Sequence, residues 1–337
     1  INGDVNALKP FKTVIIAGTR FPVPEPDKLV IDQYIMQGGR VLWFIDPVQV
    51  SIDSLSAGAS TLAYVNQHNL DDMLFRYGVR LNPVLIQDLQ CAVIPVNVSL
   101  AGQDPKFVPA PWAYYPLLAP PANHPVTRSL NLIFSQFISP VDTVGGSHEI
   151  KKHFLLYSSP NSKTLQVPFM VNLAQINSKI DEREFYGSNI PVAVELEGEF
   201  QSVFRNRPLL AYTHGQSLEF KDKSVFTRMI VVADADITRN NVQRRANGAY
   251  IIPLGYDRFT HQTFGNKELV MNMVKYLNDD EGLMGLRSRN FQLRLLDRKK
   301  VAAGRLQWQL VNTLVPSALL LLGGAVWLII RRKKYAR

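Results

Sequence analysis

Two short apolar runs, separated by a helical pattern, open the chain. Thr13–Ala17 and Arg40–Ile45 are continuous and rich in β-branched or aromatic residues, which is typical of buried strands. Between them, Asp27 is placed to cap a helix whose apolar positions include Leu29, Val30, Tyr34 and Ile35, and Gly38-Gly39 is placed to end it. A strand, a helix and a second strand in this order predict a right-handed βαβ unit.

The same patterns continue along the chain. Residues 69–77 predict a helix closed by Gly78, and Lys267–Leu277 predicts another with its apolar side chains on one face. Further strands are predicted at Val84–Ile86, Phe154–Tyr157, Val192–Leu196 and Met229–Ala233. We therefore expect an α/β fold with a mostly parallel sheet and flanking helices.

A proline-rich stretch interrupts these patterns at residues 105–125. It holds seven prolines together with Trp112, Tyr114 and Tyr115, and this density predicts no regular structure. The three aromatic residues are candidates for a partner-docking surface. The alternative is a long ordered loop packed over the sheet.

A membrane-spanning helix is predicted near the C-terminus. Residues 310–330 are 21 residues without a charge, about 30 Å as a helix, which is enough to cross the hydrocarbon. Arg331-Arg332-Lys333-Lys334 ends the apolar run, and Trp308 and Trp327 lie near its two ends. Pro316 either kinks this helix or marks its start. A buried core helix is the alternative.

Basic charge is concentrated around this apolar segment. The chain has a net charge of +9, and residues 281–337 hold twelve Lys and Arg against Glu281 and Asp297. The other residues are nearly neutral, so the charge favours a membrane surface and argues against nucleic acid. The tail and the preceding flank each carry five basic residues, so the positive-inside count is a tie. The denser tail cluster favours a cytoplasmic C-terminus.

Because the sequence begins at Ile1, we expect a preceding signal or anchor. The features above predict that the chain itself has five parts. The parts are a first α/β portion at 1–130, a second portion at 131–281 that completes or pairs with it, a basic connector at 282–309, a transmembrane helix at 310–330 and a cytoplasmic tail at 331–337.

Motifs of several enzyme classes are missing from the sequence. It contains no Walker loop, no Gly-x-Gly-x-x-Gly and no Gly-x-Ser-x-Gly. Cys91, the single cysteine, lies in an apolar run and is interpreted as a buried, inert thiol. His148-Glu149 and His153 resemble a zinc motif, but the histidines are five residues apart and leave a common helical face. No metal and no cofactor are expected.

Carboxylates after two predicted strands form the best candidate site. Asp46 follows one strand, and Asp234 and Asp236 follow another, with Arg239 and Asn240 beside them. Ligands bind beyond the carboxyl ends of strands in open α/β sheets, so these residues are candidates to hold a sugar, a cation or a basic partner residue. The alternative is that they cap helices and stabilise turns. If Arg239 pairs with the acids, a structural latch is favoured.

Several stretches of the chain resemble the GldG family, the auxiliary subunits of the gliding-motility-associated ABC transporter. The likeness runs over nearly the whole chain, and it departs at Ala235, where glycine is expected between the two aspartates. The similar stretches are Asp32–Trp43, Leu70–Arg80, Glu197–Ser202, Gly265–Lys267 and Leu293–Asp297.

The resemblance implies a non-catalytic periplasmic subunit anchored in the inner membrane, with an ABC permease and a separate ATPase as partners. It implies the glutamine-amidotransferase-like fold, also seen in an intraflagellar-transport protein, without the catalytic cysteine. It also favours a short cytoplasmic tail. Two functions stay open: a partner-binding subunit that contacts a sugar or peptide ligand, and a hydrolase or amidotransferase-like enzyme on the same fold.

Overall fold

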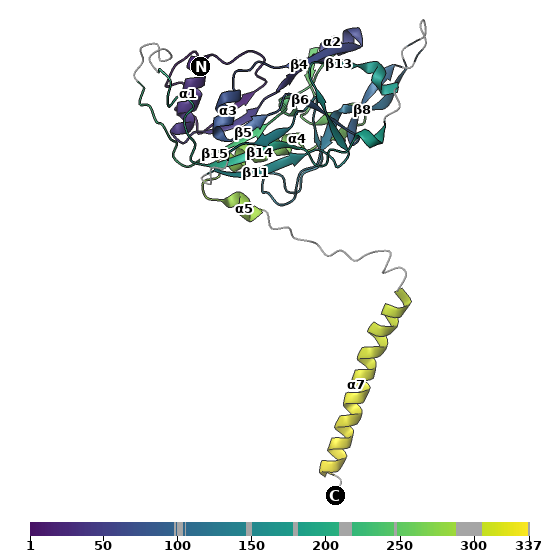
Figure 1. Ribbon diagram of the computed structural model, residues 1–337. Helices are drawn as coiled ribbons and strands as arrows, with labels where there is room; N and C mark the ends of the chain where they lie inside the picture. The colour runs from purple at the N-terminus through teal and green to yellow at the C-terminus, as the bar shows by residue number, and fades with distance from the viewer. Residues whose placement is uncertain are drawn as a thin grey trace. The chain divides into compact units, whose positions relative to one another are not determined.

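The computed structural model of the protein divides into two units, residues 1–288 and residues 289–337. The first unit contains a five-stranded mixed sheet (Figure 1). The structure describes residues 1–97, 99, 104, 106–145, 150–177, 181–208, 218–245, 248–287 and 305–335. The basic connector predicted at 282–309 falls largely outside the described residues, and so does the end of the predicted tail.

The central sheet has the strand order β1-β2-β15-β14-β11. Strands β1 and β2 are parallel, and so are β2 and β15, whereas β14 runs antiparallel to both of its neighbours. The bounds are Thr13–Ala17 for β1, Arg40–Phe44 for β2, Thr227–Val232 for β15, Pro191–Gly198 for β14 and Ile150–Tyr157 for β11. The sheet therefore draws strands from both halves of the chain.

The remaining strands form small antiparallel sheets. They are β3 Val48–Gln49, β4 Ser60–Val65, β5 Val79–Leu81, β6 Val84–Asp88, β7 Cys91–Asn97, β8 Phe107–Leu118, β9 Ile133–Phe134, β10 Val141–Thr143, β12 Ser162–Gln166, β13 Phe169–Asn172, β16 Val242–Arg245, β17 Gly248–Ile251, β18 Tyr256–Asp257 and β19 Gln262–Thr263.

The described helices are few. They are α1 Glu25–Met36, α2 Ile52–Gly58, α3 Asp71–Tyr77, α4 Asn266–Leu277, α5 Leu283–Arg287 and α7 Arg305–Tyr335, with 3₁₀ turns η1 Leu173–Asn177, η2 Glu182–Glu184 and η4 Asp236–Thr238.

The expectation of a mostly parallel α/β sheet of the amidotransferase-like type is wrong. Most described strands pair antiparallel, and helices are few. The continuous apolar runs suggested parallel strands, but they arise here because both faces of the central sheet are covered. Trp43, Val194 and Val231 pack into one apolar cluster with α1 and α3, while Phe44, Ala193 and Val232 pack into another with α4. A strand covered on both faces is apolar throughout, whatever its direction.

The glycine pair after α1 shows why the chain turns there. Gly38 has a φ of +96°, which a residue with a side chain rarely adopts. A Cβ on Gly39 would lie 2.4 Å from the ring of Tyr34, whose hydroxyl donates to the Phe11 carbonyl. The predicted end of the helix is thus correct. Its start differs, because Pro24 is the N-cap and Asp27 lies inside the helix, where it accepts from the backbone N–H of Gly3.

The proline-rich stretch is more regular than its sequence predicts. Residues 107–118 form β8, which pairs with β7 on one side and β9 on the other. A register shift occurs between Cys91 and Val93 of the partner strand β7. A proline cannot donate to a ladder, but it is compatible with the extended backbone at bulges and short pairings. The prediction of an irregular segment is therefore wrong.

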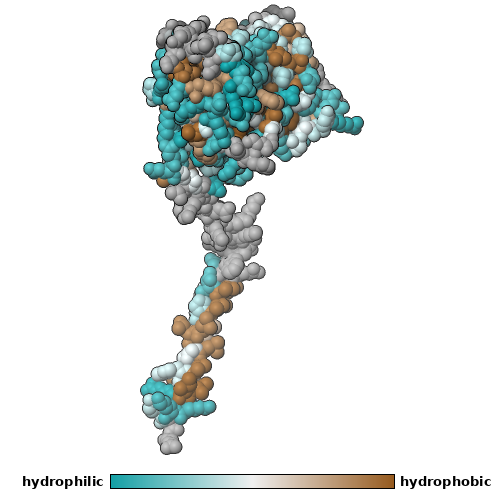
Figure 2. Space-filling view, turned by 60° about the vertical axis from the view of Figure 1, so that its left-hand side comes forward, coloured by the Kyte–Doolittle hydropathy of each residue, from teal (hydrophilic) through white to brown (hydrophobic). Residues whose placement is uncertain are grey.

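The second unit contains a single described helix, α7, which runs from Arg305 to Tyr335. Within it, Gln309–Tyr335 is long and apolar enough to cross a membrane, with a mean hydropathy of 2.2 in its most apolar window. Figure 2 shows apolar side chains along its outer surface, and Arg331 stacks over the ring of Trp327. The helix continues through Pro316, so this proline does not mark its start.

Candidate functional site

The structure brings the three candidate carboxylates together at one edge of the central sheet. Strands β2 and β15 are parallel neighbours in a register that pairs Phe44 with Val232. Asp46 and Asp234 each follow two residues later, so they leave the sheet at the same level. The Asp46 carboxylate accepts a 2.6 Å hydrogen bond from the backbone N–H of Ala235, between the other two aspartates.

Asp234 and Asp236 are held by partners within the protein. Fully buried, Asp234 accepts from the backbone N–H of Gln136 at 3.0 Å and from that of Asp236 at 2.7 Å. Arg239 lies 3.2 Å from the Asp236 carboxylate. Asn240 does not join them, because its side chain donates to the Ile252 carbonyl. This is the arrangement expected of a latch between turns.

Burial makes this cluster electrostatically costly. It raises the pKa of Asp46 to about 6, and the neighbouring Asp236 adds to the effect while Arg20 and Arg239 oppose it. Burial also raises the pKa of Asp234, with Asp236 and Asp46 as further causes. The backbone donors and Arg239 offset part of this cost. Ala235 has right-handed helical backbone angles, so the position requires no glycine.

The predicted docking aromatics do not lie on the surface. Trp112, Tyr114 and Tyr115 are 2%, 1% and 8% exposed and belong to a third apolar cluster. The Tyr115 ring packs edge-on against Phe134 and Phe137. Side chains this deeply buried pack the core beneath β8 and offer a partner no accessible surface.

A buried carboxylate joins three segments that are far apart in sequence. Asp32 of α1 is fully buried and accepts from the hydroxyl of Tyr77 in α3 at 2.8 Å. It also accepts from the Ser202 hydroxyl at 2.7 Å and the Val203 backbone N–H at 3.0 Å. Gln33 donates to the same carboxylate at 2.9 Å. The loop after β14 is thereby held against α1 and α3.

An ion-pair network reinforces the same junction. Lys28, with a side chain only 1% exposed, lies 2.5 Å from Asp72 and 3.3 Å from Glu25. Arg207 contacts the same two carboxylates, at 2.6 Å and 3.1 Å. Burial alone would raise the pKa of Asp72, but hydrogen bonds from Lys28 and Arg207 lower it overall. Two cations and two anions here compensate one another.

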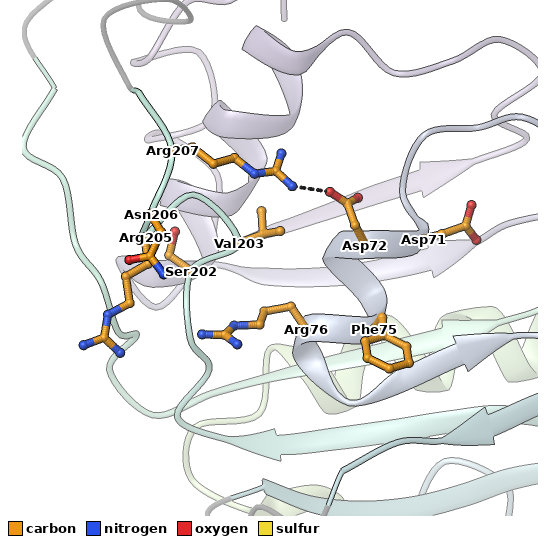
Figure 3. Close-up of a pocket in the computed structure, with 9 residues that line it drawn as sticks. All are labelled: Asp71, Asp72, Phe75, Arg76, Ser202, Val203, Arg205, Asn206 and Arg207. Atoms are coloured by element: carbon orange, nitrogen blue, oxygen red, sulfur yellow. Dashed lines mark hydrogen bonds and ion pairs between the residues drawn. The ribbon is translucent and has the colours of Figure 1, made fainter.

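An open groove lies between α3 and this loop (Figure 3). It encloses about 670 Å³. Arg76 extends from α3 toward the loop, Arg207 reaches Asp72, and Arg205 points away from the helix. The lining residues are Asp71, Asp72, Phe75, Arg76, Ser202, Val203, Arg205, Asn206 and Arg207.

A second hollow lies beside the same face of α3. It encloses about 280 Å³ and shares Asp71 and Phe75 with the first. Its other lining residues are Pro47, Val65, Asn66, His68, Arg80, Leu81 and Pro83. Phe75, which is 54% exposed, therefore stands where the two hollows meet.

Sequence reasoning did not find this groove. One usable signal was Phe75, which lies beside Arg76. The buried apolar face of this helix is already supplied by Met73 and Leu74, so an additional aromatic residue is expected on the exposed face. The loop residues Arg205–Arg207 carry no motif. Only the folded chain shows that they face α3.

The remaining candidate residues have internal explanations. Burial raises the pKa of the Cys91 thiol to about 11, which keeps it protonated at neutral pH. His153 lies on β11 opposite Glu195 of β14. Among the described residues, no group of three His, Cys, Asp or Glu is arranged to hold a metal ion. His148 and Glu149 lie outside the described residues.

Together these features define a class of protein: a folded domain with an open groove, on the same chain as a helix able to cross a membrane. The family model described as "ABC-type uncharacterized transport system" matches residues 2–273. The chain belongs to this family, and it is an auxiliary component of an ABC-type transport system that associates with transporter subunits.

Two other comparisons add little. Among solved structures, the chain is similar to one described as "mmIFT52 N-terminal domain", with 11% identity, coverage of 82% of this chain and 81% of that chain, and a TM-score of 0.41. A likeness at this TM-score decides nothing about the fold. No curated protein matches the chain.

Proposed function

We propose that this protein is a non-catalytic, extracytoplasmic auxiliary subunit of a GldG-type ABC transport system associated with gliding motility. It acts by binding its partners, a membrane permease and a separate ATPase, or a ligand of the system. The observation that carries the proposal is the family match over residues 2–273 beside a helix long and apolar enough to anchor the domain.

The dense basic cluster after the apolar stretch supports the proposed orientation of the anchor. Arg331-Arg332-Lys333-Lys334 closes the apolar stretch, and clustered basic residues favour the cytoplasmic side of a membrane. The domain of residues 1–288 then lies outside the cytoplasm, at the inner membrane. In this position it meets the outer surface of a permease, while the ATPase lies on the other side.

Thiol labelling tests this orientation. In a Cys91→Ser background, Ser188→Cys in the domain should react with a membrane-impermeant maleimide in intact spheroplasts, because Ser188 is exposed. Ala336→Cys in the tail should react only after detergent opens the membrane. Equal labelling of the tail in intact spheroplasts would contradict the proposed topology.

Co-purification tests the assignment to a transport system. The full chain, tagged and extracted in mild detergent from its native membranes, should carry the permease and ATPase encoded with it. A chain ending before residue 305 should recover less of both, since it lacks the anchor α7. Absence of the permease from the full-length preparation would overturn the proposed function.

A further inference from the structure

Arginines outnumber carboxylates among the residues that line the two hollows beside α3. Arg76, Arg80 and Arg205 are exposed, whereas Arg207 is neutralised by two carboxylates. Arg76 donates to the neutral Gln201 side chain at 2.7 Å, and Arg205 lies 3.9 Å from Asp222. Asp71 is the exposed acid among the lining residues.

The cation Arg80 has no ion pair or hydrogen bond among the described side chains. Its cross-strand neighbour Asp142 accepts from Asn82 instead, at 2.5 Å. Beside Arg80, the second hollow offers apolar surface from Pro47, Val65 and Pro83. Both hollows therefore combine arginine side chains with apolar surface, and Phe75 lines both of them.

We propose that this groove binds an acidic, extended peptide segment of a partner subunit, which is an inference that rests on the proposed function. Carboxylates of the segment would pair with Arg76, Arg80 and Arg205, because a planar guanidinium binds a carboxylate through two parallel hydrogen bonds. Apolar side chains of the segment would rest on Phe75 and Val65, which are 54% and 47% exposed.

The chemistry of the rim favours a peptide over a glycan. Arg76, Arg80 and Arg205 present charged donors that pair with carboxylates, and a neutral sugar has no charge to meet them. A peptide supplies backbone carbonyls and carboxylates as acceptors, and it also supplies side chains for the apolar surface. Charge complementarity of this kind sets the specificity and association rate of a complex.

The base of the groove is formed before any ligand arrives. Asp32 holds Ser202 and Val203 against α3, and Arg207 joins the same loop to Asp72. Binding therefore orders only the exposed rim side chains, which reduces its entropic cost.

Fluorescence anisotropy on the purified full chain in detergent tests the proposal. The probe is a short fluorescein-labelled peptide that alternates glutamate with leucine and phenylalanine. It should bind at least about tenfold more tightly than the same peptide with lysine in place of glutamate, and added salt should weaken it. Equal binding of the two peptides would overturn the proposal.

Variants locate the binding. Arg76→Glu combined with Arg80→Glu should weaken the acidic peptide by about tenfold or more, and Phe75→Ser should weaken it separately. The matched control is Arg183→Glu combined with Lys267→Glu, which reverses two exposed charges elsewhere and should leave binding unchanged. Loss in the control variant as well would show a general charge effect and contradict the groove as the site.

Competition distinguishes other occupants. If oligogalacturonate or glycerol phosphate displaces the peptide at lower concentration than the unlabelled peptide does, the groove is a glycan or headgroup site and the proposal fails. Failure of the proposed function looks different. In that case the wild-type chain does not co-purify with the permease, whatever the peptide assay shows.

Discussion

Replacing Asp32 with alanine should lower the free energy of unfolding of the domain by about 4 kcal/mol, a large part of the stability of a typical domain. The reason is that buried donors from Tyr77, Ser202 and Val203 would lose their common acceptor. Asp32→Asn should cost about half as much, because one oxygen remains. Urea unfolding of the full chain in detergent, followed by tryptophan fluorescence, measures both.

The control for Asp32 is an exposed carboxylate. Glu219→Gln changes the same charge on the surface and should shift the unfolding midpoint very little. If Asp32→Ala were as stable as Glu219→Gln, the buried network would have no role in joining the loop to α3. Peptide binding at the groove should fall in parallel with the loss of the loop contact.

Asp234→Asn should destabilise the domain by about 2 kcal/mol. Each oxygen of Asp234 accepts from a backbone N–H, of Gln136 and Asp236, and the amide nitrogen of asparagine cannot accept. One buried N–H would therefore lose its partner. Thermal unfolding below about pH 4 measures this loss, because there the carboxyl is protonated in both states and the charge that burial disfavours is absent. An unchanged melting temperature together with weakened binding of a sugar or cation would instead favour a ligand site.

Asp46→Asn is the matched variant, and it should raise the stability of the domain instead of lowering it. Its remaining oxygen still accepts from the Ala235 N–H, while the charge is removed. Because burial raises the folded-state pKa of Asp46 to about 6, the wild type loses stability as pH rises through that value. At pH 8 the variant should be more stable by about 2 kcal/mol, and below pH 4 this advantage should disappear. An advantage that grows in acid would contradict this assignment.

Local patterns predicted what depends on local chemistry. The ends of α1 and α3 were found because Gly38 and Gly78 adopt positive φ angles that favour glycine. Asp46 and Asp234 were expected to meet only if the strands before them were parallel, and they lie together because β2 and β15 are parallel neighbours in matched register.

Long-range pairings were not predictable in this way. The direction of β14 is set by its neighbours in the sheet. Its apolar residues would give the same sequence pattern in a parallel and in an antiparallel strand. The groove depends on contacts between Asp32 and Ser202, 170 residues apart in the sequence. The proline content of β8 led to a wrong prediction of irregular structure. The position of this strand is determined by its aromatic side chains, which pack in the core.

The loop that Asp32 anchors carries its structural and its surface residues at separate positions. Ser202 faces inward to the buried carboxylate, whereas Arg205 and Asn206 are exposed. Exposed positions tolerate substitution with little change in stability. Related transport systems could therefore exchange the rim residues, and with them the preferred ligand, while keeping the buried contact between Ser202 and Asp32. The same separation makes this loop a practical place to engineer new binding specificity without redesigning the domain.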